Sequence, residues 1–99
     1  MAFVYILESA KDGQLYTGST TDLRRRIKEH NLGRSKSTRY RRPLRLVYYE
    51  EHTTLVEARI REKALKSPTL GKHKRDLIAR FPSNRLIMFA KSNGRGASS

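Results

Sequence analysis

The 99-residue sequence contains no cysteine, which excludes a disulfide scaffold, a thiol nucleophile and a zinc finger held by thiolates. Its longest apolar run, Met1 to Leu7, is far too short to span a bilayer. The sequence also lacks the charged leader followed by an apolar segment that would indicate secretion. We therefore expect a cytoplasmic protein without membrane contact. Acidic residues are also scarce, because 9 Asp and Glu stand against 22 Lys and Arg, which gives a net charge of +13.

This basic excess predicts a polyanionic partner, since a charge so far from zero repels itself unless a polyanion offsets it. Of the 22 basic residues 14 are Arg, whose planar guanidinium matches phosphate geometry. The 36% of hydrophobic residues supply enough apolar material for one small core and hence one domain. Composition favours nucleic acid as the partner, although a structural protein of a ribonucleoprotein would have the same totals.

Local patterns predict an α+β domain in which a three-stranded antiparallel sheet is flanked by helices, in the order β-β-α-β-α-α. Asp12-Gly13 is a hairpin turn signal, and the Thr54 and Glu57 pair is a capping box that opens a helix, which Ser67-Pro68 ends. The domain is expected to cover 1–91, with a disordered tail at 92–99. The expected elements are strands at 3–7, 14–18 and 46–50, helices at 22–32, 54–66 and 72–81, a loop at 33–45, and an edge strand or packed segment at 86–89.

Between residues 24 and 45 lie ten basic residues and one acid, Glu29. Ser35, Ser37, Thr38 and Tyr40 are interleaved, and their hydroxyls can donate to phosphate oxygens. A solvated loop that only prevents aggregation is the alternative, but the concentration of charge favours contact with a phosphate backbone. The residues expected to bind nucleic acid are Arg24, Arg25, Lys28, Arg34, Lys36, Arg39, Arg41, Arg42 and Gly18, the last because a small residue at a strand end permits close approach.

Three polar residues occupy helix faces that a simple core would fill with apolar side chains. Arg26 and His30 share a face with Leu23 and Ile27, so they should border the sheet. Glu62 falls within the apolar stripe of the 54–66 helix, where a carboxylate is costly unless a cation or hydrogen-bond donors compensate it. A salt bridge to an arginine and a metal ligand are equally compatible with that position.

Tyr5 and Tyr16 lie in the two arms of the expected hairpin. Tyrosines in strands are usually core residues with the hydroxyl at the rim. Their occurrence together with an arginine, a histidine and a single helical glutamate in a basic domain favours a functional site.

The ordered pattern of these residues resembles the GIY-YIG nuclease superfamily. Val4-Tyr5-Ile6 and Tyr16-Thr17-Gly18 resemble the two strands that give the superfamily its name. Arg26 follows eight residues after the glycine, His30 four later, and Glu62 lies on a downstream helix. The likeness covers about Phe3 to Phe81 and is closest to small stand-alone members that consist of the nuclease domain alone.

The sequence also departs from the superfamily pattern. The first triplet reads Val-Tyr-Ile in place of Gly-Ile-Tyr, and Thr17 replaces the Ile of the second. Many members carry an Asn soon after the Glu, whereas the first Asn downstream of Glu62 is Asn84. The first change affects the backbone and leaves the residues of the chemistry in place.

The resemblance implies a metal-dependent endonuclease that hydrolyses phosphodiester bonds in DNA, in repair or recombination. Glu62 would hold one divalent metal, Mg²⁺ or Mn²⁺, and Arg26 would bind the scissile phosphate. Tyr5 would accept a proton from the attacking water, with His30 as the alternative base, and Tyr16 would orient water or phosphate. A non-catalytic nucleic-acid-binding domain that retains the fold is the alternative, and a protein partner or a second copy could supply specificity.

Overall fold

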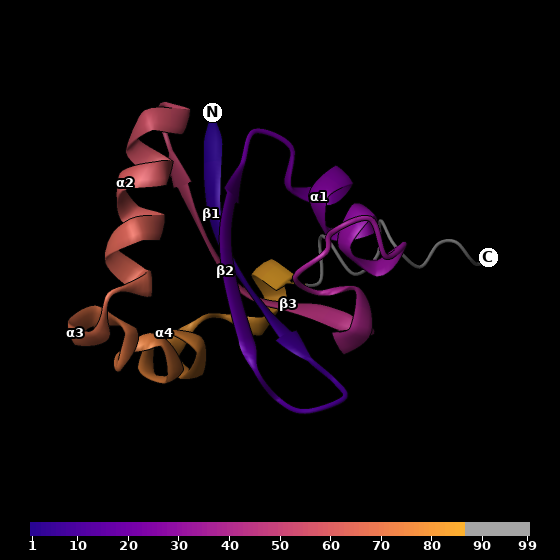
Figure 1. Ribbon diagram of the computed structural model, residues 1–99. Helices are drawn as coiled ribbons and strands as arrows, with labels where there is room; N and C mark the ends of the chain where they lie inside the picture. The colour runs from indigo at the N-terminus through magenta and orange to yellow at the C-terminus, as the bar shows by residue number, and fades with distance from the viewer. Residues whose placement is uncertain (87–99) are drawn as a thin grey trace.

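The computed structural model describes residues 1–86, so the tail expected at 92–99 and all but the first residue of the segment expected at 86–89 lie outside the described residues (Figure 1). That first residue, Leu86, is helical and not part of an edge strand. The described part confirms the α+β fold and the three-stranded antiparallel sheet. In chain order the elements are β1 (Ala2–Ser9), β2 (Leu15–Thr20), α1 (Leu23–Asn31), η1 (Arg39–Arg41), β3 (Leu44–His52), α2 (Leu55–Lys66), α3 (Pro68–Gly71) and α4 (Lys74–Arg80).

The central strand is β1, since the strand order is β2-β1-β3. It is paired on both edges and covered on both faces, and Val4, Ile6 and Leu7 are fully buried. This position explains why the strand is a continuous apolar run rather than an alternation of polar and apolar residues.

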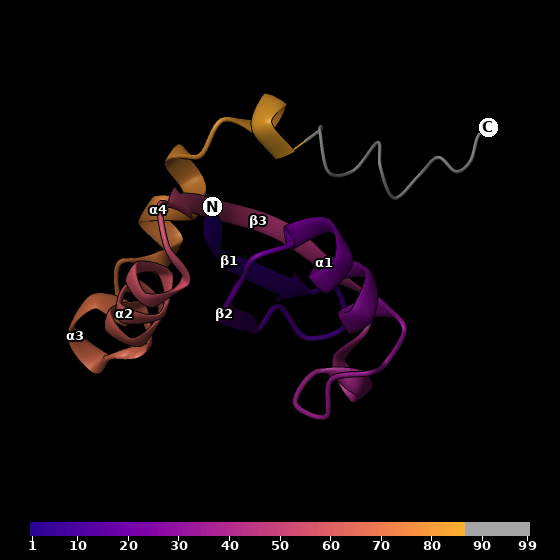
Figure 2. The same cartoon turned by 90° about the horizontal axis from the view of Figure 1, so that it is seen from above.

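Helices cover the two faces of the sheet separately. Tyr5 and Leu7 point toward α1, where they pack with Leu23 and Ile27, whereas Val4 points toward α2. Viewed from above, α1 lies on one side of the sheet and α2 to α4 lie on the other (Figure 2). Because β2 is an edge strand, side chains from both faces can meet around it.

Local capping interactions begin and end the helices as the sequence predicts. The Asp22 side chain accepts from the Arg25 N–H at the start of α1, and Gly33, with φ 80°, follows its end. Thr54 accepts from the Glu57 N–H at the start of α2, and the Glu57 carboxylate accepts from the N–H preceding the cap. These caps fix where each helix begins, and so which side of α1 carries Arg26 and which side of α2 carries Glu62.

Each of two connecting segments contains a short helix that the sequence analysis did not predict. Ser67-Pro68 does end α2, but Pro68 also begins the short helix α3, since proline fits the first helical position, where no N–H is needed. The loop expected at 33–45 contains the 3₁₀ turn η1, and β3 begins two residues early at Leu44, whose N–H donates to Asn31 Oδ1 at 2.8 Å. Within residues 1–86, no helix combines the length and apolarity needed to cross a membrane.

Candidate active site

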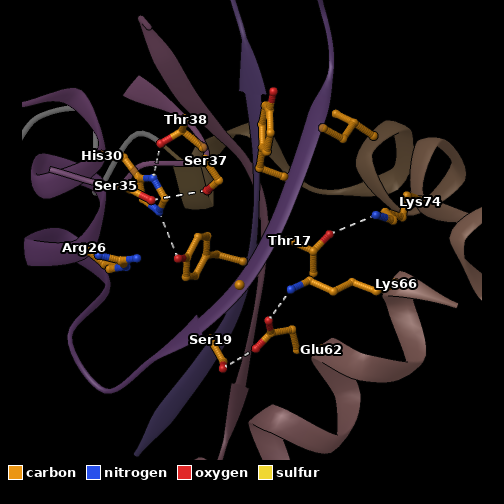
Figure 3. A pocket seen from close by; sticks show the side chains of 14 residues that line it. Thr17, Ser19, Arg26, His30, Ser35, Ser37, Thr38, Glu62, Lys66 and Lys74 are labelled. Carbon is orange, nitrogen blue, oxygen red and sulfur yellow. Dashed lines mark hydrogen bonds and ion pairs between the residues drawn. The ribbon is translucent and has the colours of Figure 1, made fainter. Parts of the chain in front are cut away.

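A cleft of about 420 Å³ opens around the edge strand β2 (Figure 3). One half lies on the α1 face of the sheet and the other on the α2 face, because alternate residues of β2 point to opposite sides. The two helices therefore contribute side chains to a single opening. The cleft is lined by Tyr5, Leu15, Tyr16, Thr17, Gly18, Ser19, Arg26, His30, Ser35, Ser37, Thr38, Glu62, Lys66 and Lys74.

On the α1 face, a chain of hydrogen bonds holds the Tyr5 hydroxyl. The hydroxyl lies 3.1 Å from Nε2 of His30, and Nδ1 of the same ring lies 2.8 Å from Oγ1 of Thr38. His30 and Thr38 are 4% and 1% exposed, so the imidazole is fixed between two partners and has no free nitrogen. His30 thus positions the phenol, and Tyr5 presents its hydroxyl to the cleft.

Gly18 provides the space in which the Tyr5 ring lies. A Cβ atom at position 18 would lie 2.6 Å from Cζ of Tyr5, closer than real side chains approach. Gly18 is paired with Tyr5 in the sheet, so the ring passes directly over the glycine. The group that approaches Gly18 closely is therefore the Tyr5 ring, and glycine is required at this position by packing within the protein.

Gly18→Ala is expected to lower the free energy of unfolding by about 1–3 kcal/mol, because the added methyl group must displace the Tyr5 ring. Urea denaturation measures the loss, and the tyrosine hydroxyl resonance reports whether the bond to His30 survives. An unchanged unfolding energy would show that the ring moves aside without cost.

Arg26 reaches the cleft from α1 and is restrained on that helix. Its guanidinium pairs with Glu29 at 3.1 Å, and its side chain is 35% exposed. Burial holds the pKa of Tyr5 above its usual value, and hydrogen bonding to Arg26 and the positive charge of Arg26 offset only part of that rise. Arg26 is thus placed both to meet an anion in the cleft and to favour the phenolate form of Tyr5.

The buried imidazole of His30 is kept neutral. Burial and the nearby charge of Arg26 lower its pKa from 6.5 to about 4, and Glu29 offsets only part of this. Between these two pH values the unfolded chain binds a proton that the folded chain does not, so stability falls as pH falls through this window. We expect the free energy of unfolding to be about 2 kcal/mol lower at pH 5 than at pH 7.

Denaturation at the two pH values, together with an NMR titration of the His30 ring, measures this effect. His30→Asn should lose most of the pH dependence, whereas His73→Asn, at an exposed histidine, should retain it. A ring that titrates near 6.5 in the folded protein would contradict the assignment.

On the α2 face, Glu62 is held by one residue of the edge strand and one of its own helix. Ser19 Oγ donates to one carboxylate oxygen at 2.5 Å, and Lys66 Nζ donates to the other at 2.7 Å. Burial raises the pKa of Glu62, but these hydrogen bonds and the charges of Lys66 and Arg59 outweigh it, so the pKa lies below its usual value. Glu62 is thus an ionised carboxylate at the cleft wall, and its cationic partner is a lysine.

The donor set fits a hydrated hard cation. Glu62 is the one acidic residue that lines the cleft, and no three His, Cys, Asp or Glu side chains among residues 1–86 form a group that could enclose a metal. Mg²⁺ is commonly bound through one or two carboxylates and several waters, so Glu62 is a suitable ligand for it. A metal at this carboxylate would compete with Lys66 for Oε2.

The structure brings together all the residues predicted to carry chemistry. The predicted residues that line the cleft are Tyr5, Tyr16, Gly18, Arg26, His30 and Glu62. Tyr16 lies on the same face of the sheet as Tyr5, and its hydroxyl donates to Gln14 at 3.4 Å. Asn84 does not line the cleft.

The basic residues predicted to bind nucleic acid lie outside the cleft. Some of their charges are used within the protein, since Arg25 pairs with Glu29 and Arg41 pairs with Asp12. Thr38, expected to donate to phosphate, is instead buried against His30. The predicted basic residues that do not line the cleft are Arg24, Arg25, Lys28, Arg34, Lys36, Arg39, Arg41 and Arg42.

Sequence reasoning missed the polar residues that surround Glu62. Ser19 and Thr17 alternate with Gly18 on β2 and so point toward α2, which the strand period would have indicated. Lys66 follows Glu62 by one helical turn, a spacing typical of an ion pair. Lys74 meets the edge strand through its bond to Thr17, and no local signal predicts a contact across 57 positions.

The fold and the cleft define a protein of the GIY-YIG class: residues 1–76 match the model of the GIY-YIG catalytic domain, and the chain belongs to this family. Among its members, the chain is 48% identical to a UPF0213 protein of Haloquadratum walsbyi over 71% of this chain and 79% of the relative. A UPF0213 protein of Streptococcus sanguinis is 45% identical over 69% and 78%, respectively. UPF0213 protein BH0048 from Bacillus halodurans, which has a solution structure, is 42% identical in sequence to this chain. The match covers 78% of this chain and 85% of that one, with a TM-score of 0.47. A catalytic domain of this family is of nuclease type.

Proposed function

We propose that the chain is a metal-dependent endonuclease that hydrolyses phosphodiester bonds in DNA in the cytoplasm. The observation that carries the proposal is the convergence of Tyr5, Arg26 and Glu62 on one cleft from opposite faces of the sheet. A phenol, a guanidinium and an ionised carboxylate supply a proton acceptor, an anion-binding group and a cation ligand.

The reaction adds water across a P–O bond and yields a phosphomonoester and an alcohol. Arg26 binds the scissile phosphate and stabilises the negative charge that grows on its oxygens. Tyr5 accepts the proton of the attacking water. Burial keeps the pKa of Tyr5 above its usual value, so the phenolate form depends on the hydrogen bond and the charge of Arg26. His30 holds the phenol in place through its hydrogen bond. Its low pKa makes an imidazolium costly there, so His30 is the weaker candidate for the proton acceptor. Tyr16 orients the water or the phosphate from the same face.

Mg²⁺ or Mn²⁺ held by Glu62 would supply Lewis-acid stabilisation of the leaving oxygen. Ser19 would orient the carboxylate, since its hydroxyl already donates to one oxygen. Lys66 would then release its bond to Glu62 and remain as a cation at the cleft wall.

The alternative is a nucleic-acid-binding domain that retains the fold without catalysis. The Glu62–Lys66 ion pair favours it, because the pair gives the carboxylate a structural partner without any metal. Nicked, flapped, branched, single-stranded and duplex DNA, with RNA counterparts, should be tested for binding and for cleavage in Mg²⁺ and in Mn²⁺. Cleavage of at least one DNA substrate supports the proposal, whereas binding without cleavage supports the alternative.

A further inference from the structure

Lys74 is a cation in the cleft that the proposed reaction does not use. It begins α4 and donates to Thr17 Oγ1 of the edge strand at 3.0 Å, across 57 positions of sequence (Figure 3). The Lys74 side chain is half-buried, and among residues 1–86 its ammonium group donates to the neutral hydroxyl of Thr17. Lysines that only improve solubility usually extend into water, so the position calls for another explanation.

The environment of Lys74 is unfavourable for a cation in the free protein. Burial lowers the pKa of its ammonium group, and the charge of Lys66 lowers it further. Two ammonium groups thus face the same half of the cleft, with Glu62 as the one acidic residue there. Lys66 already donates to Glu62, so an anion bound here would be held by Lys74 and by the remaining N–H groups of Lys66, and it would offset the repulsion and replace the lost hydration.

Lys74 is held in place by the residue that follows it. Arg75 donates to Glu8 Oε2 at 2.7 Å and to the Gly13 carbonyl at 2.8 Å, which fixes the start of α4 to the β1–β2 hairpin. Leu77 packs on the buried face of the sheet in the next turn. The ammonium is therefore presented by a rigid element, as a binding subsite requires.

We propose that Lys74, together with Lys66, forms a second anion subsite that takes a phosphate next to the scissile one on the same nucleic-acid strand. This rests on the proposed function for its assignment of the scissile phosphate to Arg26. Arg26 lies on the α1 side of β2 and Lys74 on the α2 side, so two successive phosphates would lie on opposite sides of the edge strand. A nucleoside 3′,5′-bisphosphate carries two phosphates on one sugar, so it is a small probe of both positions at once.

Binding of deoxythymidine 3′,5′-bisphosphate tests the subsite against the 5′- and 3′-monophosphates. Titration calorimetry in EDTA gives the affinities without any cleavage. The wild-type chain should bind the bisphosphate at least about tenfold more tightly than either monophosphate. Lys74→Gln should abolish this preference, and Lys74→Arg, which keeps the charge, should retain most of it.

Lys72→Gln is the matched control, because Lys72 is exposed two residues earlier and does not line the cleft. It should keep the wild-type preference. Equal affinities for the three nucleotides, a preference that survives Lys74→Gln, or no nucleotide binding at all would each overturn the subsite. A chain that prefers the bisphosphate but cleaves no DNA would keep the subsite and refute the proposed endonuclease, so the two failures are distinguishable.

Discussion

Glu62→Gln is expected to reduce the single-turnover rate of DNA cleavage at least about 100-fold, while DNA affinity stays within about twofold. A metal ion contributes several kcal/mol to phosphoryl transition states, and each 1.4 kcal/mol is about tenfold in rate. Glutamine keeps the shape and can still accept from Ser19, but it is a poor ligand for a hard cation. Cleavage of labelled DNA in Mg²⁺ and Mn²⁺ gives the rates, and fluorescence anisotropy in EDTA gives the affinities.

Glu51→Gln is the matched control for this variant, because Glu51 is exposed on β3 and does not line the cleft. It makes the same change of charge and should cleave at the wild-type rate. The free energy of unfolding of Glu62→Gln should change by less than about 1 kcal/mol, since Lys66 is 54% exposed and such ion pairs contribute little. Equal cleavage by Glu62→Gln and wild type would exclude a role for this carboxylate in holding a metal.

Arg26→Ala is expected to lower the cleavage rate at saturating protein by about 100- to 1,000-fold, the usual effect of removing a fixed donor to a developing oxyanion. The affinity for DNA should fall much less, because one phosphate contact among many is lost. Rates measured over a range of protein concentrations separate the two effects.

Arg25→Ala provides the comparison for Arg26→Ala. Arg25 also pairs with Glu29, but its side chain is 75% exposed and outside the cleft. Arg25→Ala should lower the affinity for DNA and weaken the salt dependence of DNA binding, and it should leave the cleavage rate at saturating protein unchanged. If Arg26→Ala behaved in the same way, Arg26 would be one more phosphate contact on a basic surface.

The sequence predicted the elements whose signals are local. The apolar run of β1, the Asp12-Gly13 turn and the caps at Asp22 and Thr54 each act within a few residues, so their positions could be assigned from the sequence. The start of β3 depends on the Asn31 side-chain amide, which donates to the Leu44 carbonyl and accepts from the Leu44 N–H. That contact joins positions 13 residues apart, and no local pattern encodes it.

The same distinction separates the predicted from the missed site residues. Arg26 and Glu62 could be selected because each occupies a helix face where periodicity makes a polar group conspicuous, and Tyr5 because it occurs together with them. Ser19 and Lys74 gain their roles from contacts across 43 and 57 positions, respectively. The nucleic-acid contacts expected of the basic stretch stay a prediction, although ion pairs such as Arg41–Asp12 use some of its charges within the fold.

The most direct test of the central claim is a time course of DNA cleavage by the purified chain, at saturating protein, in Mg²⁺ or Mn²⁺ and in EDTA. The account predicts that product accumulates with the divalent metal, stops when EDTA is added and resumes when excess metal is restored. A folded chain that binds DNA and produces no cleavage with either metal, or that cleaves equally in EDTA, would contradict a metal-dependent endonuclease built on Tyr5, Arg26 and Glu62.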